Sequence, residues 1–445
     1  MRKTPLDSWI RDRLTLGSHM PLTRSLMEDY QLAKLREVVA YLKESNPFYR
    51  ALLPVSFDPF TMDFEAFSHL PFTYPRDLSS VGIGMVSASL NDITRIVTLN
   101  TSGTTGDEKR VFFTEEDMEL TIDFFRVGML TMVEKGATVI IFLPGKKPDS
   151  VGDLLARALE RLGVEAVIHG PVTDIAAARD EILSHTSPCL VGIPTQILSI
   201  ARSDAPQKTI PKGWVDSVLL STDYIPLSIT KALDELWGCK VFCHYGMTEM
   251  GLGGGVECEA RAGCHMREAD LYVEIIDPLT GVPVEDGVSG EVVFTTLTRR
   301  GMPLLRYRTG DVAGFLPGPC PCGSVIKRLG KVLGRLGAEV RLKNGLNITL
   351  QDLDETLFSV DGVLNYLAEI AHDDGKNRLY LTFYTAGSKK HEVPAKVREA
   401  LSQSPTLRRA FEQGGLSLGG VELTCQDWIT TGVRKRMIVD RRVAV

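Results

Sequence analysis

Short apolar runs alternate with segments of helical periodicity along residues 138–244. The runs are rich in Val, Ile and Leu, which is typical of strands that are buried on both faces. The pattern predicts strands at 138–143, 165–169, 189–193, 217–221 and 240–244, and helices at 150–162 (with Ser150 as N-cap), 173–185, 195–201 and 226–236. Strands that alternate with helices predict a parallel sheet covered by helices, whose ligands bind at the carboxyl ends of the strands.

The hydrophobic period changes on both sides of this region. Before it, we expect a helix over 26–42 that Asn46-Pro47 ends, a strand–loop–strand unit over 95–113, and a helix from 114 to about 134. After it, the runs 271–276 and 291–296 flank a turn at 277–281 and predict an antiparallel hairpin. The last part predicts a hairpin at 340–349, helices at 349–360 and 393–401, and strands at 366–371 and 378–384.

These elements predict an α/β protein with two domains. Residues 1–334 should form a large N-terminal domain with mostly parallel sheets covered by helices, including a small β-rich subdomain at about 256–330. Residues 335–445 should form a small, mobile α+β domain. A chain of 445 residues is long enough for both.

Composition and charge narrow the class of protein. Apolar residues make up 44% of the chain, which indicates a globular protein. The net charge of −6 and the lack of a long basic run argue against nucleic acid as a partner. No apolar run is long enough to span a bilayer, and the charged N-terminus lacks a signal-peptide core, so we expect a cytoplasmic protein without a membrane partner. The eight cysteines should therefore be reduced unless they bind metal, and Cys189, Cys239, Cys243 and Cys425, which lie in or beside apolar runs, are interpreted as core residues.

A loop rich in glycine and hydroxyl side chains lies between two predicted strands and ends at Lys109. Its residues are Thr101, Ser102, Gly103, Thr104, Thr105 and Gly106. Glycines let the backbone bring its N–H groups close to a ligand, and the hydroxyls and Lys109 add donors and a positive charge, as a polyphosphate requires. The spacing differs from the Walker pattern. A polar turn between strands is the alternative.

Three further motifs follow the loop in order. They are Tyr245-Gly246-Met247-Thr248-Glu249, Tyr307-Arg-Thr-Gly-Asp311 and Gly334-Arg335. Together with the loop they resemble the adenylate-forming superfamily of acyl-CoA synthetases, adenylation domains and luciferases. The segments 30–36, 46–49 and 295–311 are similar to the phenylacetate–CoA ligase branch, and the resemblance extends over roughly residues 25–440.

The resemblance implies a role for each motif in activating a carboxylic acid with ATP. The loop, with Thr104 and Lys109, would contact the β- and γ-phosphates, and Thr248 would contact the α-phosphate. Tyr245 would stack on adenine, Asp311 would bind the ribose hydroxyls, and Arg335 would approach the ribose or phosphate. Glu249 would hold Mg²⁺, which prefers hard oxygen ligands. Taken singly, Tyr245 could be a strand-end aromatic residue, Asp311 a turn residue and Arg335 a linker cation.

The family's acyl pocket would lie after residues 191–195, at Ser221, Thr222 and Asp223, and beside His244 and Gly246. Its mixture of small and apolar residues permits an aryl or medium-length acid. His244 itself is interpreted as a packed histidine rather than a catalyst.

The C-terminal motif departs from the family pattern. Phenylacetate–CoA ligases have Gly-Lys-x-Lys-Arg, in which the first lysine bridges the carboxylate and the phosphate, and here the segment reads Gly432-Val-Arg-Lys-Arg436. Val433 occupies the first lysine position and Lys435 matches the second, so Lys435 or Arg434 would substitute, or adenylation would be weak. In the hinge, Gly337-Ala338 replace the two acidic residues that relatives usually have.

A cysteine and histidine set predicts a structural zinc site. Cys320-Pro-Cys322 forms a knuckle, and Cys258, Cys264 and His265 lie together further upstream. Some phenylacetate–CoA ligases have a similar pattern, which favours Cys258, His265, Cys320 and Cys322 as the ligands over Cys264. Reduced thiols, or a redox pair, are the alternatives.

The leading hypothesis is an AMP-forming acid–thiol ligase that uses ATP, Mg²⁺ and coenzyme A and carries a structural Zn²⁺. The expected partners are a small-molecule carboxylic acid, ATP and CoA, with a homodimer as a possible assembly. In a second hypothesis, the enzyme forms the adenylate and transfers its acyl group to a carrier protein or an amine. In a third hypothesis, the protein is a degenerate nucleotide-binding module. Val433 supports this hypothesis, whereas Glu249 and Asp311 argue against it.

Overall fold

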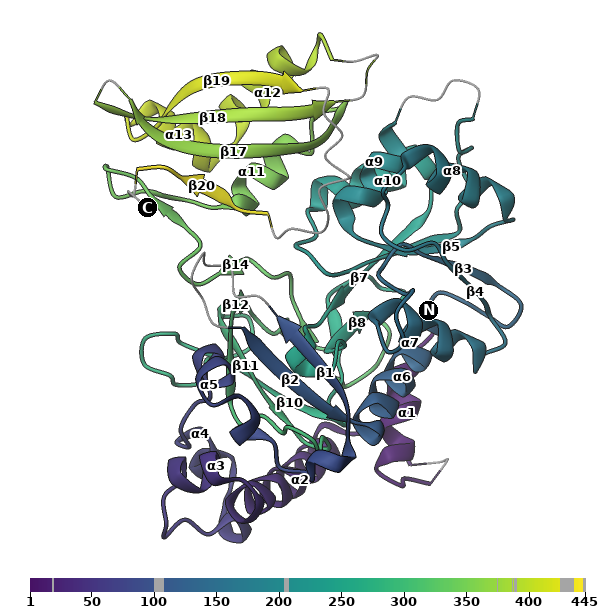
Figure 1. Ribbon diagram of the computed structural model, residues 1–445, viewed down its shortest axis with the longest axis vertical. Helices are drawn as coiled ribbons and strands as arrows, with labels where there is room; N and C mark the ends of the chain where they lie inside the picture. The colour runs from purple at the N-terminus through teal and green to yellow at the C-terminus, as the bar shows by residue number, and fades with distance from the viewer. Residues whose placement is uncertain are drawn as a thin grey trace. The chain divides into compact units, whose positions relative to one another are not determined.

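The structure is a computed structural model (Figure 1). It describes residues 1–17, 20–99, 108–203, 208–373, 375–385, 387, 390–424 and 436–442. The chain divides into two compact units, the first with residues 1–135, 147–164 and 242–333 and the second with residues 136–146, 165–241 and 334–445. The break after Leu333 coincides with the predicted start of the C-terminal domain, while the second unit also includes much of the predicted strand–helix region. The division into domains 1–334 and 335–445 stays a prediction.

The second unit contains the predicted parallel sheet. Its strands run in the order β6-β5-β3-β4 and pair in parallel. They are β3 (Thr138–Ile141), β4 (Glu165–Ile168), β5 (Cys189–Gly192) and β6 (Ser217–Leu220), and the helices between and after them are α8 (Ile175–Ser184), α9 (Pro194–Arg202) and α10 (Leu227–Trp237). Strands β5 and β6 are buried along their whole length, as their apolar sequences predict. The predicted α/β fold class is confirmed.

The rest of the second unit is an α+β arrangement. Its elements are β14 (Gly334–Arg335), β15 (Val340–Arg341), β16 (Asn347–Ile348), α11 (Leu350–Leu357), β17 (Val363–Asp373), β18 (Lys376–Thr385), α12 (Val393–Gln403), α13 (Pro405–Glu412), β19 (Ser417–Thr424) and β20 (Ile438–Asp440). A four-stranded sheet in the order β19-β18-β17-β20 has α12 and α13 beside it in Figure 1. Apolar residues of these helices share one core with β17 and β18.

Two side chains dock this α+β part onto helices α9 and α10. The Glu355 carboxylate on α11 accepts hydrogen bonds from the backbone N–H groups of Leu227 and Ser228, at 2.9 and 3.0 Å, and from the Tyr224 hydroxyl at 2.9 Å. Because the first N–H groups of a helix have no partner within it, Glu355 caps α10 from outside. Arg202 on α9 makes the second contact. Its guanidinium donates hydrogen bonds to the backbone carbonyl oxygens of three residues that come after α11, namely Phe358, Val360 and Val363.

Replacing Glu355 with alanine should lower the free energy of unfolding by about 1–2 kcal/mol, because the N-terminus of α10 loses its carboxylate cap. Denaturation in urea measures the change. Glu412→Ala is the matched control, since Glu412 lies 3.9 Å from Arg408 with its side chain 69% exposed, and its loss should leave stability nearly unchanged. Equal effects of the two substitutions would contradict the assignment of Glu355 as a cap.

The first unit combines helices with short sheets. Its helices are α1 (Pro5–Arg13), α2 (Arg24–Ser45), α3 (Pro47–Leu52), α4 (Phe64–Ser68), α5 (Pro75–Ser80), α6 (Glu115–Met129) and α7 (Val151–Glu160), with 3₁₀ turns at Pro59–Thr61, Gly82–Met85, Leu90–Asp92 and, as η4, Thr248–Met250. Its strands are β1 (Ile93–Leu99), β2 (Lys109–Thr114), β7 (Lys240–Tyr245, which begins in the second unit), β8 (Gly255–Glu257), β9 (Cys264–Met266), β10 (Leu271–Ile276), β11 (Gly290–Thr296), β12 (Tyr307–Ala313) and β13 (Arg328–Leu329).

The predicted strand–loop–strand unit and the predicted hairpin of this unit are both present. Strands β1 and β2 pair antiparallel on the two sides of the glycine-rich loop, and β10 pairs antiparallel with β11, which pairs in turn with β12. Strands β13, β9, β8 and β7 form a second antiparallel set. The small β-rich part that the sequence predicts near 256–330 therefore consists of short, mostly buried strands.

Several helix ends differ from the prediction. Asn46 ends α2 and also begins α3, because its side chain accepts a hydrogen bond from the Tyr49 N–H. Helix α6 stops at Met129 rather than near residue 134. Ser150 does precede α7, but its hydroxyl donates to the Lys147 carbonyl instead of capping the helix.

Helix α1 was not expected from the sequence. Its Trp9 indole donates a 2.6 Å hydrogen bond to the Asp123 carboxylate on α6, and Arg13 pairs with the same carboxylate at 3.1 Å. Leu6 and Ile10 are buried beside these polar contacts. In the described part of the chain, no helix has both the length and the apolar character needed to cross a membrane.

Candidate functional site

The motif that begins at Tyr245 lies where β7 ends and turns into η4. Gly246 is required there, because a Cβ atom at this position would lie 2.4 Å from the Leu252 carbonyl oxygen. Thr248 is partly exposed, whereas the Glu249 side chain points into the unit and is only 6% exposed. The turn thus buries a carboxylate at the carboxyl end of a strand.

Lys109 and Tyr307 bind the buried carboxylate. The Lys109 ammonium, at the start of β2, lies 2.9 Å from Glu249 Oε1, and the Tyr307 hydroxyl, at the start of β12, donates to the same oxygen at 3.2 Å. Burial raises the pKa of Glu249, but the Lys109 charge and these hydrogen bonds outweigh it, so its pKa is lowered overall. Glu249 is therefore ionised at neutral pH. Lys109, Glu249 and Tyr307 are referred to below as the Glu249 cluster.

Arg299 holds the turn that carries Glu249. Its guanidinium donates to the Glu249 carbonyl oxygen at 2.7 Å, and the Thr121 hydroxyl donates to the Gly251 carbonyl at 2.9 Å. Loss of hydration lowers the pKa of Arg299 to about 10, which still leaves it charged at neutral pH. Two side chains from outside the motif therefore fix the backbone on which the carboxylate depends.

Asp311 lies on the same strand as Tyr307. The Tyr245 hydroxyl donates to Asp311 Oδ2 at 3.1 Å, and the Thr309 hydroxyl accepts from the Asp311 N–H at 2.9 Å. The structure thus pairs two predicted nucleotide-binding residues that are 66 positions apart in the sequence. Lys109 and Glu249 are a second such pair, 140 positions apart.

Tyr307 and Arg299 are site residues that the sequence interpretation missed. Tyr307 begins the motif that ends at Asp311, so that motif carried the signal for it. Arg299 is adjacent to the segment 295–298 that supported the family resemblance, but nothing in its sequence context indicates a bond to a backbone carbonyl.

Four of the residues predicted for the nucleotide and acyl sites belong to the second unit. Ser221, Thr222 and Asp223 follow β6, and Arg335 is an exposed residue of β14. Thr222 has φ of 75°, a conformation that costs a β-branched residue energy. Two further predictions lie outside the described residues, namely the loop from Thr101 to Gly106 and Lys435.

His244 packs against aromatic rings. The centroids of Phe124 and Phe125 lie 6.3 and 6.4 Å from the His244 ring. Loss of hydration lowers the pKa of His244 to about 4, so the imidazole is neutral at pH 7. These contacts agree with its interpretation as a packed histidine.

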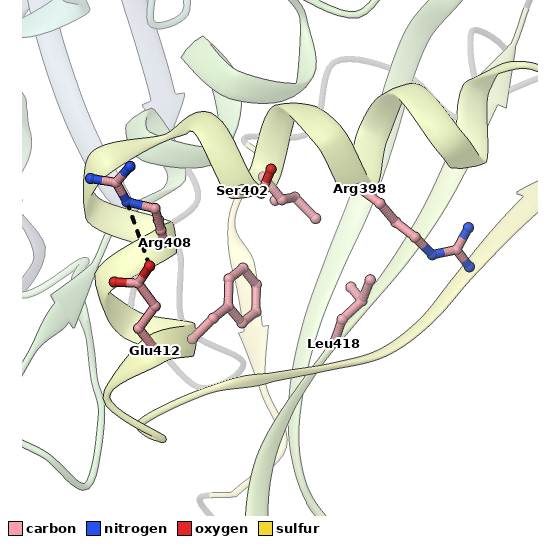
Figure 2. Close-up of a pocket in the computed structure, with 7 residues that line it drawn as sticks. Arg398, Ser402, Arg408, Glu412 and Leu418 are labelled. Carbon is pink, nitrogen blue, oxygen red and sulfur yellow. Dashed lines mark ion pairs between the residues drawn. The ribbon is translucent and has the colours of Figure 1, made fainter.

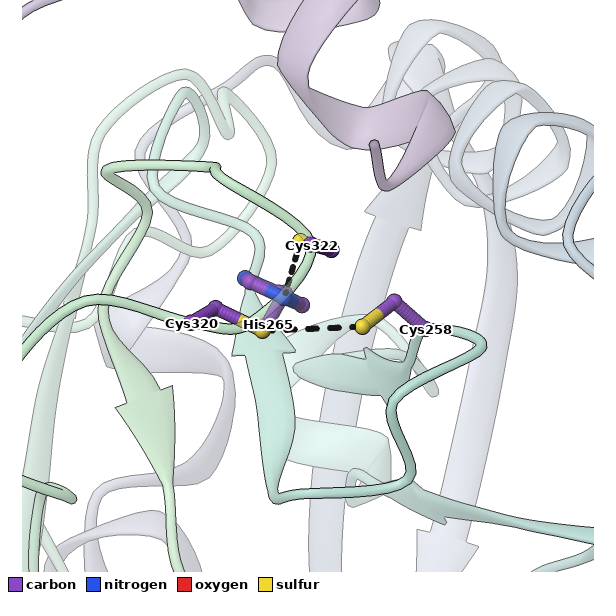
Figure 3. A group of neighbouring side chains, drawn as sticks. All are labelled: Cys258, His265, Cys320 and Cys322. Atoms are coloured by element: carbon purple, nitrogen blue, oxygen red, sulfur yellow. Dashed lines mark hydrogen bonds between the residues drawn. The ribbon is translucent and has the colours of Figure 1, made fainter. Parts of the chain in front are cut away.

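Four side chains from two distant segments meet at the predicted zinc site (Figure 3). Cys258 and His265 lie in and beside the β8–β9 hairpin, and Cys320 and Cys322 lie on the segment before β13. All four are buried, and their ligand atoms lie within 4.8 Å of one another. Cys264 is not part of the group, because its Sγ instead donates to the Cys243 carbonyl at 3.5 Å.

Two of the six distances among these four atoms match those of a tetrahedral ion. Cys258 Sγ lies 3.7 Å from Cys320 Sγ, and Cys322 Sγ lies 3.5 Å from His265 Nε2. Two sulfurs on a tetrahedral zinc lie ~3.8 Å apart, and a sulfur and a nitrogen ~3.6 Å apart, given Zn–S of about 2.3 Å and Zn–N of about 2.05 Å. The sulfur pair is too far apart for a disulfide, whose S–S bond is about 2.05 Å. The donor set and its dimensions therefore suit zinc.

The second unit also has a surface cavity of about 370 Å³ in the α12–α13–β19 region (Figure 2). It is lined by Arg398, Leu401, Ser402, Arg408, Phe411, Glu412 and Leu418. Arg408 and Glu412 form an exposed ion pair at 3.9 Å across one helical turn. None of the residues predicted from the motifs lines this cavity.

Comparison with known proteins places the chain in a family. Residues 89–297 match the AMP-binding enzyme family. The chain is 30% identical over 370 residues to a phenylacetate-coenzyme A ligase of Thermus thermophilus, with 80% of each chain covered. It is 26% identical over 380 residues to a phenylacetate-coenzyme A ligase of Pseudomonas putida, covering 78% of this chain and 79% of that one.

Solved structures of the same fold include 2-hydroxyisobutyryl-CoA ligase. In its postadenylation state with 2-HIB-AMP, the TM-score is 0.79 at 20% identity, over 95% of this chain and 91% of that chain. In its thioesterification state with 2-HIB-AMP and CoA, the TM-score is 0.67 at 21% identity over the same shares.

The chain therefore belongs to the AMP-binding family of adenylate-forming enzymes. Within that family its similarity is to the phenylacetate–CoA ligase branch. The resemblance inferred from the ordered motifs, and the expectation of a ligase-type enzyme, are confirmed.

Proposed function

We propose that this enzyme activates a carboxylic acid with ATP and transfers the acyl group to coenzyme A. In the first step a carboxylate oxygen attacks the α-phosphorus, an acyl-adenylate forms and pyrophosphate leaves. In the second step the CoA thiolate attacks the acyl carbon and AMP leaves. The observation that carries the proposal is the Glu249 cluster, a buried carboxylate and a lysine held together beside a motif that family members share.

The first unit supplies the groups for the nucleotide. Bound Mg²⁺ would neutralise charge on the phosphates, and the ionised Glu249 is the hard oxygen ligand suited to hold it. Lys109 would contact the β- and γ-phosphates together with the loop from Thr101 to Gly106. Thr248 would contact the α-phosphate, Tyr245 would stack on adenine, and Asp311 would accept hydrogen bonds from the ribose.

The second unit would complete the reaction. Family members have a lysine at the position of Val433. Here Lys435 would take over the role of that lysine and would bridge the carboxylate and the phosphate. Ser221, Thr222 and Asp223 would border the nucleotide and the acyl group, and Arg335 would approach the ribose or phosphate. Residues 335–445 would act as a mobile domain in the alternation between the two steps.

An aryl or related acid is the proposed substrate class. Two relatives that match more than three quarters of this chain are phenylacetate-coenzyme A ligases, and one of them is 30% identical to it.

A structural zinc would accompany this chemistry. Four protein ligands, Cys258, His265, Cys320 and Cys322, would close the coordination shell, so the ion would stabilise the fold and leave no position for a substrate.

Pyrophosphate exchange tests the first step. The enzyme is incubated with ATP, Mg²⁺, labelled pyrophosphate and a panel of acids that includes phenylacetate, and label should enter ATP only with the correct acid. Adding CoA should then give a thioester and AMP. Exchange without a thioester would favour transfer to a carrier protein or an amine, and no exchange with any acid would favour a nucleotide-binding module.

Replacing Asp311 with alanine should raise KM for ATP by about 10- to 100-fold and change kcat less, since one or two charge-assisted hydrogen bonds to the ribose would be lost. Pyrophosphate exchange at varied ATP concentrations measures both constants. Asp286→Ala is the matched control, because Asp286 is exposed and pairs only with Lys327 at 3.6 Å. An unchanged KM for ATP in the Asp311→Ala variant would mean that Asp311 does not bind the ribose.

A further inference from the structure

The N-terminal segment of the chain contacts both segments that carry the predicted zinc ligands. In the β8–β9 hairpin, the Glu259 carboxylate accepts hydrogen bonds from the Arg2 backbone N–H and from the Arg2 guanidinium, at 3.1 and 3.2 Å. On the segment before β13, the Ser324 hydroxyl donates to Asp7 Oδ2, in the first turn of α1, at 2.9 Å. Residues 2–7 therefore bridge the two parts of the first unit that a zinc ion would also join.

One of the ligands is contacted directly from the start of α1. The backbone N–H of Thr4, the N-cap residue of α1, and that of Ser324 both donate toward Cys322 Sγ. Thr4, Asp7 and Ser324 are all buried. Because metal ligands are held in position by hydrogen bonds from the residues around them, these groups have the place of an outer shell at Cys322.

Helix α1 needs contacts of this kind in order to form. It has nine residues, and an isolated helix of that length is unstable in water. Leu6 and Ile10 are fully buried on its inner face. At its far end, Trp9 and Arg13 bind the Asp123 carboxylate on α6. The contacts near Cys322 hold the opposite end of α1, so its docking depends on how firmly the ligand segments are held.

Zinc binding and the docking of α1 are then linked in both directions. The four ligands lie on the β8–β9 hairpin and on the segment before β13, and the N-terminal segment binds each of these. Whatever factor docked α1 contributes to zinc affinity, zinc contributes the same factor to the docking of α1.

We propose that residues 2–7 are the outer shell of the zinc site and that the ion in return holds α1 in its docked position. The inference rests on the structural zinc of the proposed function. It gives a purpose to a helix that the sequence did not predict, and it is independent of the reaction at the Glu249 cluster.

Zinc affinity tests the outer shell. Ser324→Ala keeps all four ligands but removes the hydroxyl that binds Asp7, and it should weaken zinc binding by about 10-fold, the lower end of the range for loss of an outer-shell partner. Competition with a chromogenic zinc chelator measures the dissociation constant. Ser8→Ala is the matched control on the exposed face of α1, where the Ser8 hydroxyl donates to the Pro5 carbonyl of the same helix, and it should bind zinc normally.

Proteolysis tests the docking of α1. Chymotrypsin cleaves after aromatic residues, and the Trp9–Ile10 bond should be cut only when α1 leaves its docked position, since both side chains are buried. Chelation of zinc, or Cys322→Ser, should speed this cut by about 10-fold or more, because the coupling is reciprocal. Mass spectrometry of the released N-terminal peptide gives the rate.

A second variant separates this effect from a general loss of stability. Phe67 is fully buried on α4 and is not a zinc ligand, so Phe67→Leu should lower Tm while zinc binding and the slow cut after Trp9 are kept. Equally fast cleavage in Phe67→Leu and Cys322→Ser would overturn the inference, because cleavage would then follow global unfolding.

Two other results would reject the inference alone, provided that the wild type binds zinc. One is a normal zinc affinity in Ser324→Ala, and the other is a rate of cleavage after Trp9 that is the same with and without zinc. A wild-type protein that binds no zinc would reject the zinc site itself, and the inference with it.

Discussion

Replacing Glu249 with glutamine should lower kcat/KM for adenylation by about 100- to 1,000-fold, the range found when one electrostatic group of an active site is removed. Glutamine has nearly the same shape and can still accept hydrogen bonds from Lys109 and Tyr307. It lacks the negative charge, however, so Mg²⁺ would lose an anionic ligand and Lys109 its counter-ion. Pyrophosphate exchange at several Mg²⁺ concentrations measures the loss.

Because glutamine leaves the mostly buried Lys109 ammonium without its counter-charge, the Tm of the variant should also fall, and kcat/KM is therefore measured at a temperature where the variant is folded. Glu285→Gln is the matched control, since Glu285 is exposed in the segment between β10 and β11 and should retain full activity. A normal kcat/KM and an unchanged need for Mg²⁺ in the Glu249→Gln enzyme would mean that Glu249 takes no part in the reaction and is a buried structural carboxylate.

The regular part of the fold could be predicted because its signals are local. Buried parallel strands such as β5 and β6 are continuous apolar runs, and the helices between them have a different period, so both elements are visible in a short window. The hairpin of β15 and β16 has an Asn-Gly turn, which is also a local signal. Helix ends were predicted less well, because competing bonds such as that of the Ser150 hydroxyl depend on neighbouring backbone.

The sequence predicted the motifs of the candidate site but not the contacts between them. Tyr245, Glu249 and Asp311 belong to recognisable segments, but the pairs that the structure forms are long-range contacts that no local pattern encodes. Arg299 is a similar case, since its bond is to a backbone carbonyl and any residue could have supplied that acceptor. The buried pair of Asp354 and Arg436 joins positions 82 apart, and a sequence interpretation would place both charges on the surface.

Zinc removal should destabilise the first unit, because the four ligands join the β8–β9 hairpin to the segment before β13. The local cluster of buried apolar residues consists of Cys258, Cys320 and Cys322, with only Ala260 packed against it. Strands β8, β9 and β13 are two or three residues long and cannot supply much packing. We therefore expect about one zinc per chain in protein purified without added metal, and a Tm lower by about 10 °C after chelation, at about 2–4 °C for each kcal/mol lost.

Single cysteine substitutions separate zinc binding from general packing. Cys322→Ser should lose zinc and show the reduced Tm without chelator, because serine is a poor zinc ligand. Cys264→Ser should keep about one zinc per chain, since Cys264 is a buried residue beside His265 whose Sγ donates to the Cys243 carbonyl and is not one of the four grouped ligands. Wild-type protein without zinc, or a Tm that chelation does not change, would mean that these residues are reduced thiols packed as small apolar side chains. Equal zinc loss in the two variants would instead mean that metal binding follows the integrity of the hairpin rather than ligation by Cys322.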